Sequence, residues 1–173
     1  MVLTKEELIS SVGDEVRVLT HLIGKIEESM LEYRPTPKQR TMMELLRYLA
    51  AFPTIHIKAC VAPAFDMEAF RKDWTEESAR LASLGFEQLK AEFARQPVII
   101  ADLAGKLTDE ELRQDFSMFG SDGSRGLWLV QMLLQHYAAY RMQLFMYLKG
   151  AGREELNTMN LWMGVDGPMQ PPS

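Results

Sequence analysis

The sequence is poor in several features that define large protein classes. Its 173 residues include a single cysteine, Cys60, so no disulfide can form within the chain. No apolar run reaches the roughly 18 residues that a membrane-spanning helix needs, so no contact with a membrane is expected. The first residues, 1–7, are too polar for a signal peptide. These absences predict a reduced, cytoplasmic protein.

Basic charge and phosphate-binding loops are also missing. The chain has 19 Lys and Arg residues against 24 Asp and Glu residues, which gives a net charge of -5. A nucleic-acid partner would require a basic face, so none is expected. Neither a glycine-rich phosphate loop nor a nucleophile elbow occurs, which argues against a nucleotide-binding or serine-hydrolase fold.

Helical periodicity is abundant in the first half of the chain. Thr4 to Glu7 form a capping box, and a helix is predicted from there to about residue 32, where two prolines follow. Its apolar residues recur every three or four positions: Ile9, Val12, Val16, Leu19, Ile23, Ile26 and Met30. A second capping box, Thr41 to Glu44, predicts a helix that is interrupted or kinked at Pro53 and ends before Pro63.

The second half of the chain predicts two further long helices. Residues 62–73 are expected to form a crossover loop, and a third helix begins at Thr75 and bends or ends at Pro97, with a further helical piece over 98–104. Residues 115–126 are expected to be a loop. The last helix should end near Gly150, with one face formed by Leu129, Leu133, His136, Tyr140, Leu144 and Tyr147.

Four amphipathic helices bury their apolar faces best against one another, so the predicted fold class is all-α, a four-helix bundle with a long crossover between helices 2 and 3. Residues 1–152 form this bundle in the prediction. Residues 153–173 form a tail whose apolar part packs on the bundle or on a second subunit, and whose proline-rich end is flexible.

Three polar side chains are the candidate site residues. His136 and Tyr140 are four positions apart on the inward face of the last helix, a spacing with which helical residues can clamp a metal ion. Tyr48 lies on the inward face of the second helix and would join them if the two helices are neighbours. The alternative is that all three are hydrogen-bonded core residues.

Two segments resemble the signatures of the DinB/YfiT-like family. His136 to Leu144 is similar to the family's last helix, in which two histidines separated by three residues precede Arg and Gln-Leu. Arg40 to Leu49 is similar to its second helix, in which an Arg-Ser/Thr pair precedes Glu-Leu-Leu, one residue, a histidine and Leu. The resemblance implies a four-helix bundle, often a homodimer, with a pocket at one end.

In typical family members three histidines in that pocket hold a divalent metal such as zinc or nickel. The corresponding positions in this chain are Tyr48, His136 and Tyr140, so one ligand of three is kept. A neutral phenol with a pKa of about 10 is a poor zinc ligand. We therefore expect no tightly bound metal and a hydrogen-bonded Tyr-His-Tyr pocket instead.

The remaining histidines and the cysteine are predicted to lie outside this pocket. His56 is about 12 Å along an ideal helix from Tyr48 and points roughly 80° away, so it is not expected to join His136. His21 lies on the polar face of the first helix and should be solvated. Cys60 should be a buried, inert thiol.

Three functions follow from these residues. The first is a family member with a degenerate triad that binds a small molecule or serves as a dimeric module. The second is a metal-dependent transferase or hydrolase of small metabolites, similar to the family's thiol S-transferases, in which His136 holds zinc or nickel; a metal-free variant uses His136 as a general base. In the third, the cluster is purely structural.

Overall fold

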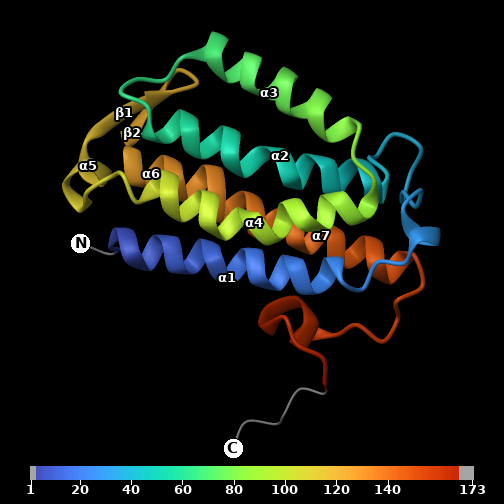
Figure 1. The fold of residues 1–173 in the computed structure, drawn as a ribbon. Helices are drawn as coiled ribbons and strands as arrows, with labels where there is room; N and C mark the ends of the chain where they lie inside the picture. The colour runs from blue at the N-terminus through green and yellow to red at the C-terminus, as the bar shows by residue number, and fades with distance from the viewer. Residues whose placement is uncertain (1–2, 168–173) are drawn as a thin grey trace, which may run out of the picture.

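The computed structural model describes residues 3–167 and is an all-α four-helix bundle, as predicted (Figure 1). The bundle comprises α1 (Lys5–Ile23), α2 (Met42–Val61), α4 (Phe86–Ala104) and a last helix formed by α6 (Arg125–Leu129), a π-helical segment (Val130–Gln135) and α7 (His136–Gly150). Within residues 3–167, no helix is long and apolar enough to cross a membrane.

Capping boxes fix the start of the helices, as the sequence indicates. The Thr4 hydroxyl accepts a hydrogen bond from the Glu7 N–H (3.2 Å), and the Glu7 carboxylate accepts one from the Thr4 N–H (2.7 Å). Thr41 and Glu44 repeat this arrangement at α2. A third box at Thr108 begins the short helix α5 (Asp109–Arg113). Each box satisfies backbone donors that a helix start leaves unpaired.

Helix α1 ends at Ile23, earlier than the predicted end near residue 32. Gly24 closes the helix, and a short 3-10 turn follows at Glu28–Met30. Ile26 and Met30 are buried all the same. The apolar spacing therefore predicted the burial of both residues correctly, although neither of them lies in an α-helix.

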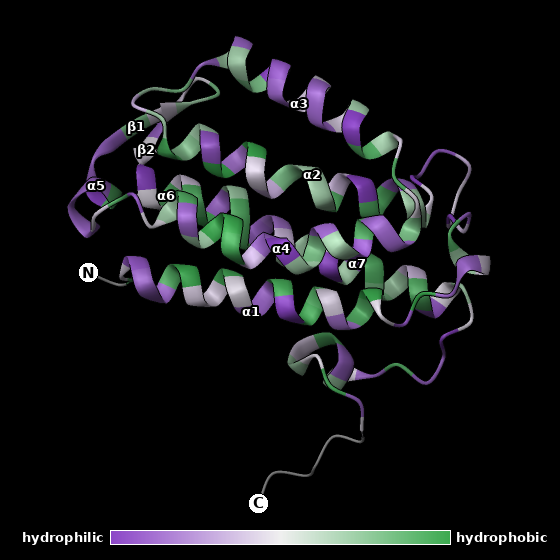
Figure 2. Cartoon of the chain, viewed as in Figure 1, coloured by the Kyte–Doolittle hydropathy of each residue, from purple (hydrophilic) through white to green (hydrophobic). Residues whose placement is uncertain are grey.

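The predicted crossover loop over 62–73 is wrong, because it contains most of the first half of a helix. Helix α3 (Met67–Ala82) begins at Asp66, whose side chain accepts from two backbone N–H groups, and a turn at 83–85 separates α3 from α4. Leu81 is its one fully buried residue. Helix α3 lies on the outer side of α2 and is largely hydrophilic (Figures 1 and 2).

Two prolines do not interrupt their helices. Helix α2 continues through Pro53 to Val61, and α4 continues through Pro97 to Ala104. A proline removes one backbone hydrogen bond, and packing over these long helices outweighs that loss. The predicted helical piece over 98–104, with its end at Gly105, is confirmed as the last part of α4.

The predicted loop over 115–126 forms an antiparallel hairpin of β1 (Asp115–Met118) and β2 (Ser121–Ser124). Phe119 and Gly120 at its tip both have positive φ, as a tight two-residue hairpin turn requires. The Phe119 ring lies 4.7 Å from that of Phe65 and 5.4 Å from that of Phe70. The hairpin therefore packs on the beginning of α3.

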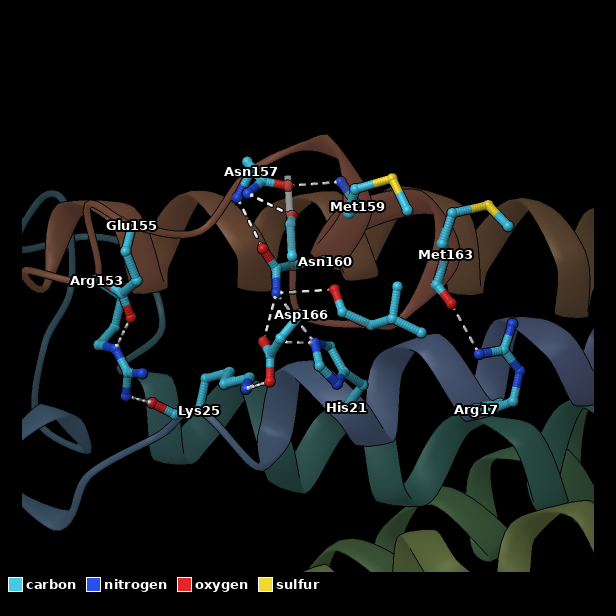
Figure 3. Close-up of polar contacts among 12 residues, drawn as sticks. Arg17, His21, Lys25, Arg153, Glu155, Asn157, Met159, Asn160, Met163 and Asp166 are labelled. Atoms are coloured by element: carbon cyan, nitrogen blue, oxygen red, sulfur yellow. Dashed lines mark hydrogen bonds and ion pairs between the residues drawn. The ribbon is translucent and has the colours of Figure 1, made fainter. Parts of the chain in front are cut away.

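The tail packs on the bundle through α1. Arg17 Nη1 donates to the Met163 carbonyl (2.8 Å), and Lys25 Nζ lies 2.6 Å from an Asp166 carboxylate oxygen (Figure 3). Asn160 Nδ2 lies 3.1 Å from Nε2 of His21, so His21 is partly covered and not solvated as predicted. The proline-rich end, 168–173, lies outside the described residues.

Arg141 joins the last helix, α1 and the tail. It is buried, its guanidinium contacts the Glu15 carboxylate (2.7 Å), and it donates to the Leu161 carbonyl. The same guanidinium lies 5.4 Å from the Trp162 ring centroid. A buried cation with one anionic partner depends strongly on that partner.

Replacing Glu15 with Gln should lower the free energy of unfolding by about 2 kcal/mol, because buried Arg141 then keeps its charge without an anion. Replacing the neighbouring Asp14 with Asn is the control. Its ion pair with Arg17 is exposed, so less than about 0.5 kcal/mol should be lost. Urea unfolding at neutral pH measures both values, and equal losses would contradict the role given to Glu15.

Candidate functional site

The structure brings the three predicted residues together where α2 passes the last helix. The ring centroids of Tyr48 and Tyr140 are 4.7 Å apart, and those of His136 and Tyr140 are 5.9 Å apart. All three side chains are half-buried. Phe52, one helical turn after Tyr48, stacks on the His136 ring at 5.4 Å.

The centre of the last helix's buried face is not where the spacing put it. Tyr137 and Arg141 are buried there, whereas His136 and Tyr140 lie at its edge. The π-helical segment before His136 has wider turns, which changes the phase of the helix relative to an uninterrupted α-helix. The Tyr137 hydroxyl donates to Gln96 Oε1 (3.0 Å), and Gln96 Nε2 donates to the Leu49 carbonyl (2.9 Å).

His56 joins His136, contrary to the prediction. Their ring centroids are 4.8 Å apart. Nδ1 of His56 lies 2.9 Å from the Met132 carbonyl oxygen, and Nδ1 of His136 lies 3.1 Å from that of Gln131. Both carbonyls belong to the π-helical segment. That segment, together with the continuity of α2 through Pro53, brings the two imidazoles together.

Two ionisable side chains of this cluster, His56 and Tyr48, are held uncharged. The pKa of His56 is lowered to about 4, mainly by burial and also by the neighbouring His136, while the hydrogen bond to the Met132 carbonyl opposes this shift. At neutral pH His56 is therefore neutral. Its Nδ1 carries the proton, because a carbonyl can only accept. Burial and a hydrogen bond with Tyr140 raise the pKa of the Tyr48 hydroxyl, so the phenol stays protonated.

Helix α3 covers the cluster with aromatic side chains. Phe70 stacks on the His56 ring at 5.7 Å, and Trp74 lies edge-on to His56 at 5.9 Å. Trp74 also stacks on Tyr48 at 5.5 Å, with 16° between the ring planes. Because the third helix was predicted to begin only at Thr75, these two aromatic residues could not be assigned to the site from the sequence.

Beside this cluster a cavity of about 500 Å³ opens between α2 and α3. Its lining consists of Arg40, Glu44, Arg47, Tyr48, Ala51, Trp74 and Ser78. The Arg40 guanidinium lies 4.5 Å from the Tyr48 ring centroid. Arg47 Nη2 donates to the Leu84 carbonyl (3.3 Å), whereas its Nε is buried without a partner. The three- and four-residue spacing of the α2 members could have identified this helix face.

The cluster does not offer a conventional metal-ligand set. Within residues 3–167, no group of three or more His, Cys, Asp or Glu side chains could hold a metal ion. The ionisable rings in contact with His136 are those of His56 and Tyr140, and Tyr48 lies against Tyr140. Cys60 is buried, as predicted, and burial raises its pKa to about 12, which keeps the thiol protonated.

Comparison with known proteins identifies the fold. A DinB-like protein from Bacillus subtilis, YjoA, superposes with a TM-score of 0.65 at 17% identity, over 87% of this chain and 94% of that one. A protein assigned provisionally to the DinB family, from Exiguobacterium sibiricum, gives a TM-score of 0.64 at 19% identity, over 90% and 96%. No family model and no curated protein match the sequence. The chain therefore has the DinB-like fold that its two motifs indicate.

Replacing His56 with Phe should flatten the dependence of stability on pH. The pKa of His56 is lower in the folded chain than in the unfolded one, so the unfolded chain takes up its proton first as pH falls. Between about pH 7.5 and about pH 5 this should cost the wild type about 2 kcal/mol more than the variant.

Urea unfolding at the two pH values measures that difference. The His21→Gln variant is the control, because it keeps His56 and should keep the steep dependence attributed to it. A His56→Phe variant that loses as much stability as the wild type would show that His56 is not held neutral by folding.

Proposed function

We propose that this DinB-like protein has a degenerate metal triad and binds a small molecule in the cavity between α2 and α3. The cavity of about 500 Å³ beside Tyr48 is the observation that carries the proposal. Its volume falls within the range of about 300–1,000 Å³ that is usual for small-molecule sites. Whether the chain also forms the expected homodimer is a separate prediction.

The cavity wall combines flat apolar surfaces with a few polar groups. Tyr48 and Trp74 present rings, whereas Arg40, Arg47 and Ser78 present hydrogen-bond donors. Such a lining is typical of ligand sites, because apolar contact supplies affinity and the polar groups set orientation. Tyr48 also contacts Tyr140, so a molecule in the cavity would rest on the cluster that contains His136.

The donor set at the triad does not fit a tightly held zinc or nickel ion. Two of the three positions are phenols, and the structural causes that raise the pKa of Tyr48 also oppose its ionisation to a ligand. His56 could add one imidazole to His136, which makes two conventional ligands where a structural or catalytic zinc site uses three or four.

A second candidate function is general base catalysis without a metal. The Gln131 carbonyl lies at Nδ1 of His136, so Nδ1 carries the proton and Nε2 is left to accept one from a bound molecule. The Tyr140 hydroxyl, on the next turn, would serve as the donor. A His136→Gln variant that binds the same ligands but loses turnover would support this function over binding alone.

Ligand binding in the cavity can be tested by filling it. Ser78 is an exposed residue of α3 at the cavity wall, so Ser78→Trp should occupy the space without disturbing the core. Compounds of a metabolite library that raise the melting temperature of the wild type should not raise that of this variant. Ala79→Trp, exposed but outside the cavity lining, is the control and should respond as the wild type does.

If library compounds raise the melting temperature of Ser78→Trp as much as that of Ala79→Trp, they bind outside this cavity. A library without any stabilising compound would favour the purely structural role of the cluster.

Elemental analysis tests the loss of the metal site. Protein purified without a histidine tag should contain zinc and nickel well below one atom per chain, because too few conventional ligands converge. His136→Ala should leave this content unchanged. Stoichiometric metal that disappears in His136→Ala would instead establish a metal centre and the metal-dependent enzyme.

A further inference from the structure

We propose that the cavity between α2 and α3 recognises a planar, apolar molecule that carries one carboxylate. This inference rests on the proposed function and adds the chemical class of the ligand. It depends on two features of the wall, the guanidinium of Arg47 and the stacked rings of Tyr48 and Trp74.

Arg47 is the anion-binding group. Its Nη2 donates to the Leu84 carbonyl at the turn between α3 and α4, and its Nε is buried without a partner. Because Nε is inaccessible, a ligand in the cavity would approach the guanidinium through Nη1. A carboxylate at the guanidinium would supply charge-assisted hydrogen bonds, which are the strongest class available to such a site.

The rings select a flat partner. Tyr48 and Trp74 stack on each other, with 16° between planes and 5.5 Å between centroids, so a planar molecule would extend this stack from outside and would not insert between the two rings. Arg40 lies over Tyr48 at 4.5 Å and adds a second flat cationic surface. Aromatic and guanidinium faces contact planar molecules with little loss of conformational freedom, so a fused ring fits this lining better than a flexible chain.

The charges of the lining indicate a monoanion. The cavity lining contains two guanidinium groups, Arg40 and Arg47, and one carboxylate, Glu44. The pKa of Glu44 is lowered, first by its hydrogen bond from the Thr41 backbone and also by Arg34 and Arg40, so the carboxylate is ionised. The lining therefore has a net charge of +1. Glu44 would repel a second carboxylate on the ligand, and the lining has no third cation to offset that repulsion.

Isothermal titration with 2-naphthoate, at low salt and neutral pH, tests the inference. The neutral isostere 2-naphthamide and the dianion naphthalene-2,6-dicarboxylate are the comparison ligands. We expect the monoanion to bind at least about tenfold more tightly than the amide, which is the size of one charge-assisted hydrogen bond. It should also bind more tightly than the dianion.

Variants assign the contacts. Arg47→Gln should reduce naphthoate affinity to that of the amide, and Trp74→Leu should weaken both ligands together. Arg95→Gln is the control, because Arg95 is an exposed residue of α4 outside the cavity lining. If Arg47→Gln does not fold, which urea unfolding shows, Arg40→Gln replaces it and should likewise weaken the anion more than the amide.

Equal affinity for the acid and the amide, or an unchanged naphthoate affinity in both arginine variants, would overturn the assigned ligand class. So would the absence of measurable naphthoate binding. None of these outcomes would affect the proposed function if library compounds still stabilise Ala79→Trp and not Ser78→Trp, so the two ideas fail separately.

Discussion

Packing of α2 against the last helix is the contact on which the candidate site depends. It is made by rings: Tyr48 against Tyr140, and Phe52 against His136. Tyr48 also stacks on Trp74 of α3 and lines the cavity between α2 and α3. The two motifs lie on different helices, and without these contacts their residues would not come together at one site.

The π-helical segment of the last helix fixes the orientation of the two histidines at this contact. Its carbonyls at Gln131 and Met132 pair with Nδ1 of His136 and His56, so two imidazoles lie side by side with the same nitrogen protonated. Such segments are concentrated at functional sites, because wider turns redirect side chains and release backbone acceptors. Burial then keeps both the imidazole of His56 and the phenol of Tyr48 uncharged.

Helix α3 gives the site its ligand-sized space. It buries little of its own surface in the bundle, yet Phe70 and Trp74 close over His56 and Tyr48. The cavity lies between this outer helix and α2, and Trp74 forms part of its wall. The same aromatic side chains connect the cavity to the His56–His136 pair.

The sequence by itself determined the starts of α1 and α2, the all-α bundle and the meeting of Tyr48, His136 and Tyr140, because capping boxes and apolar spacing are local signals that survive in the fold. It could not locate the start of α3, the turn that separates α3 from α4, or the hairpin tip at Phe119. Only the tertiary structure decided that His56 lies against His136 and that Arg47 faces a cavity. Both depend on the phase of a π-helical segment and on an outer helix packed across the bundle, and neither is encoded in the spacing of residues along one helix.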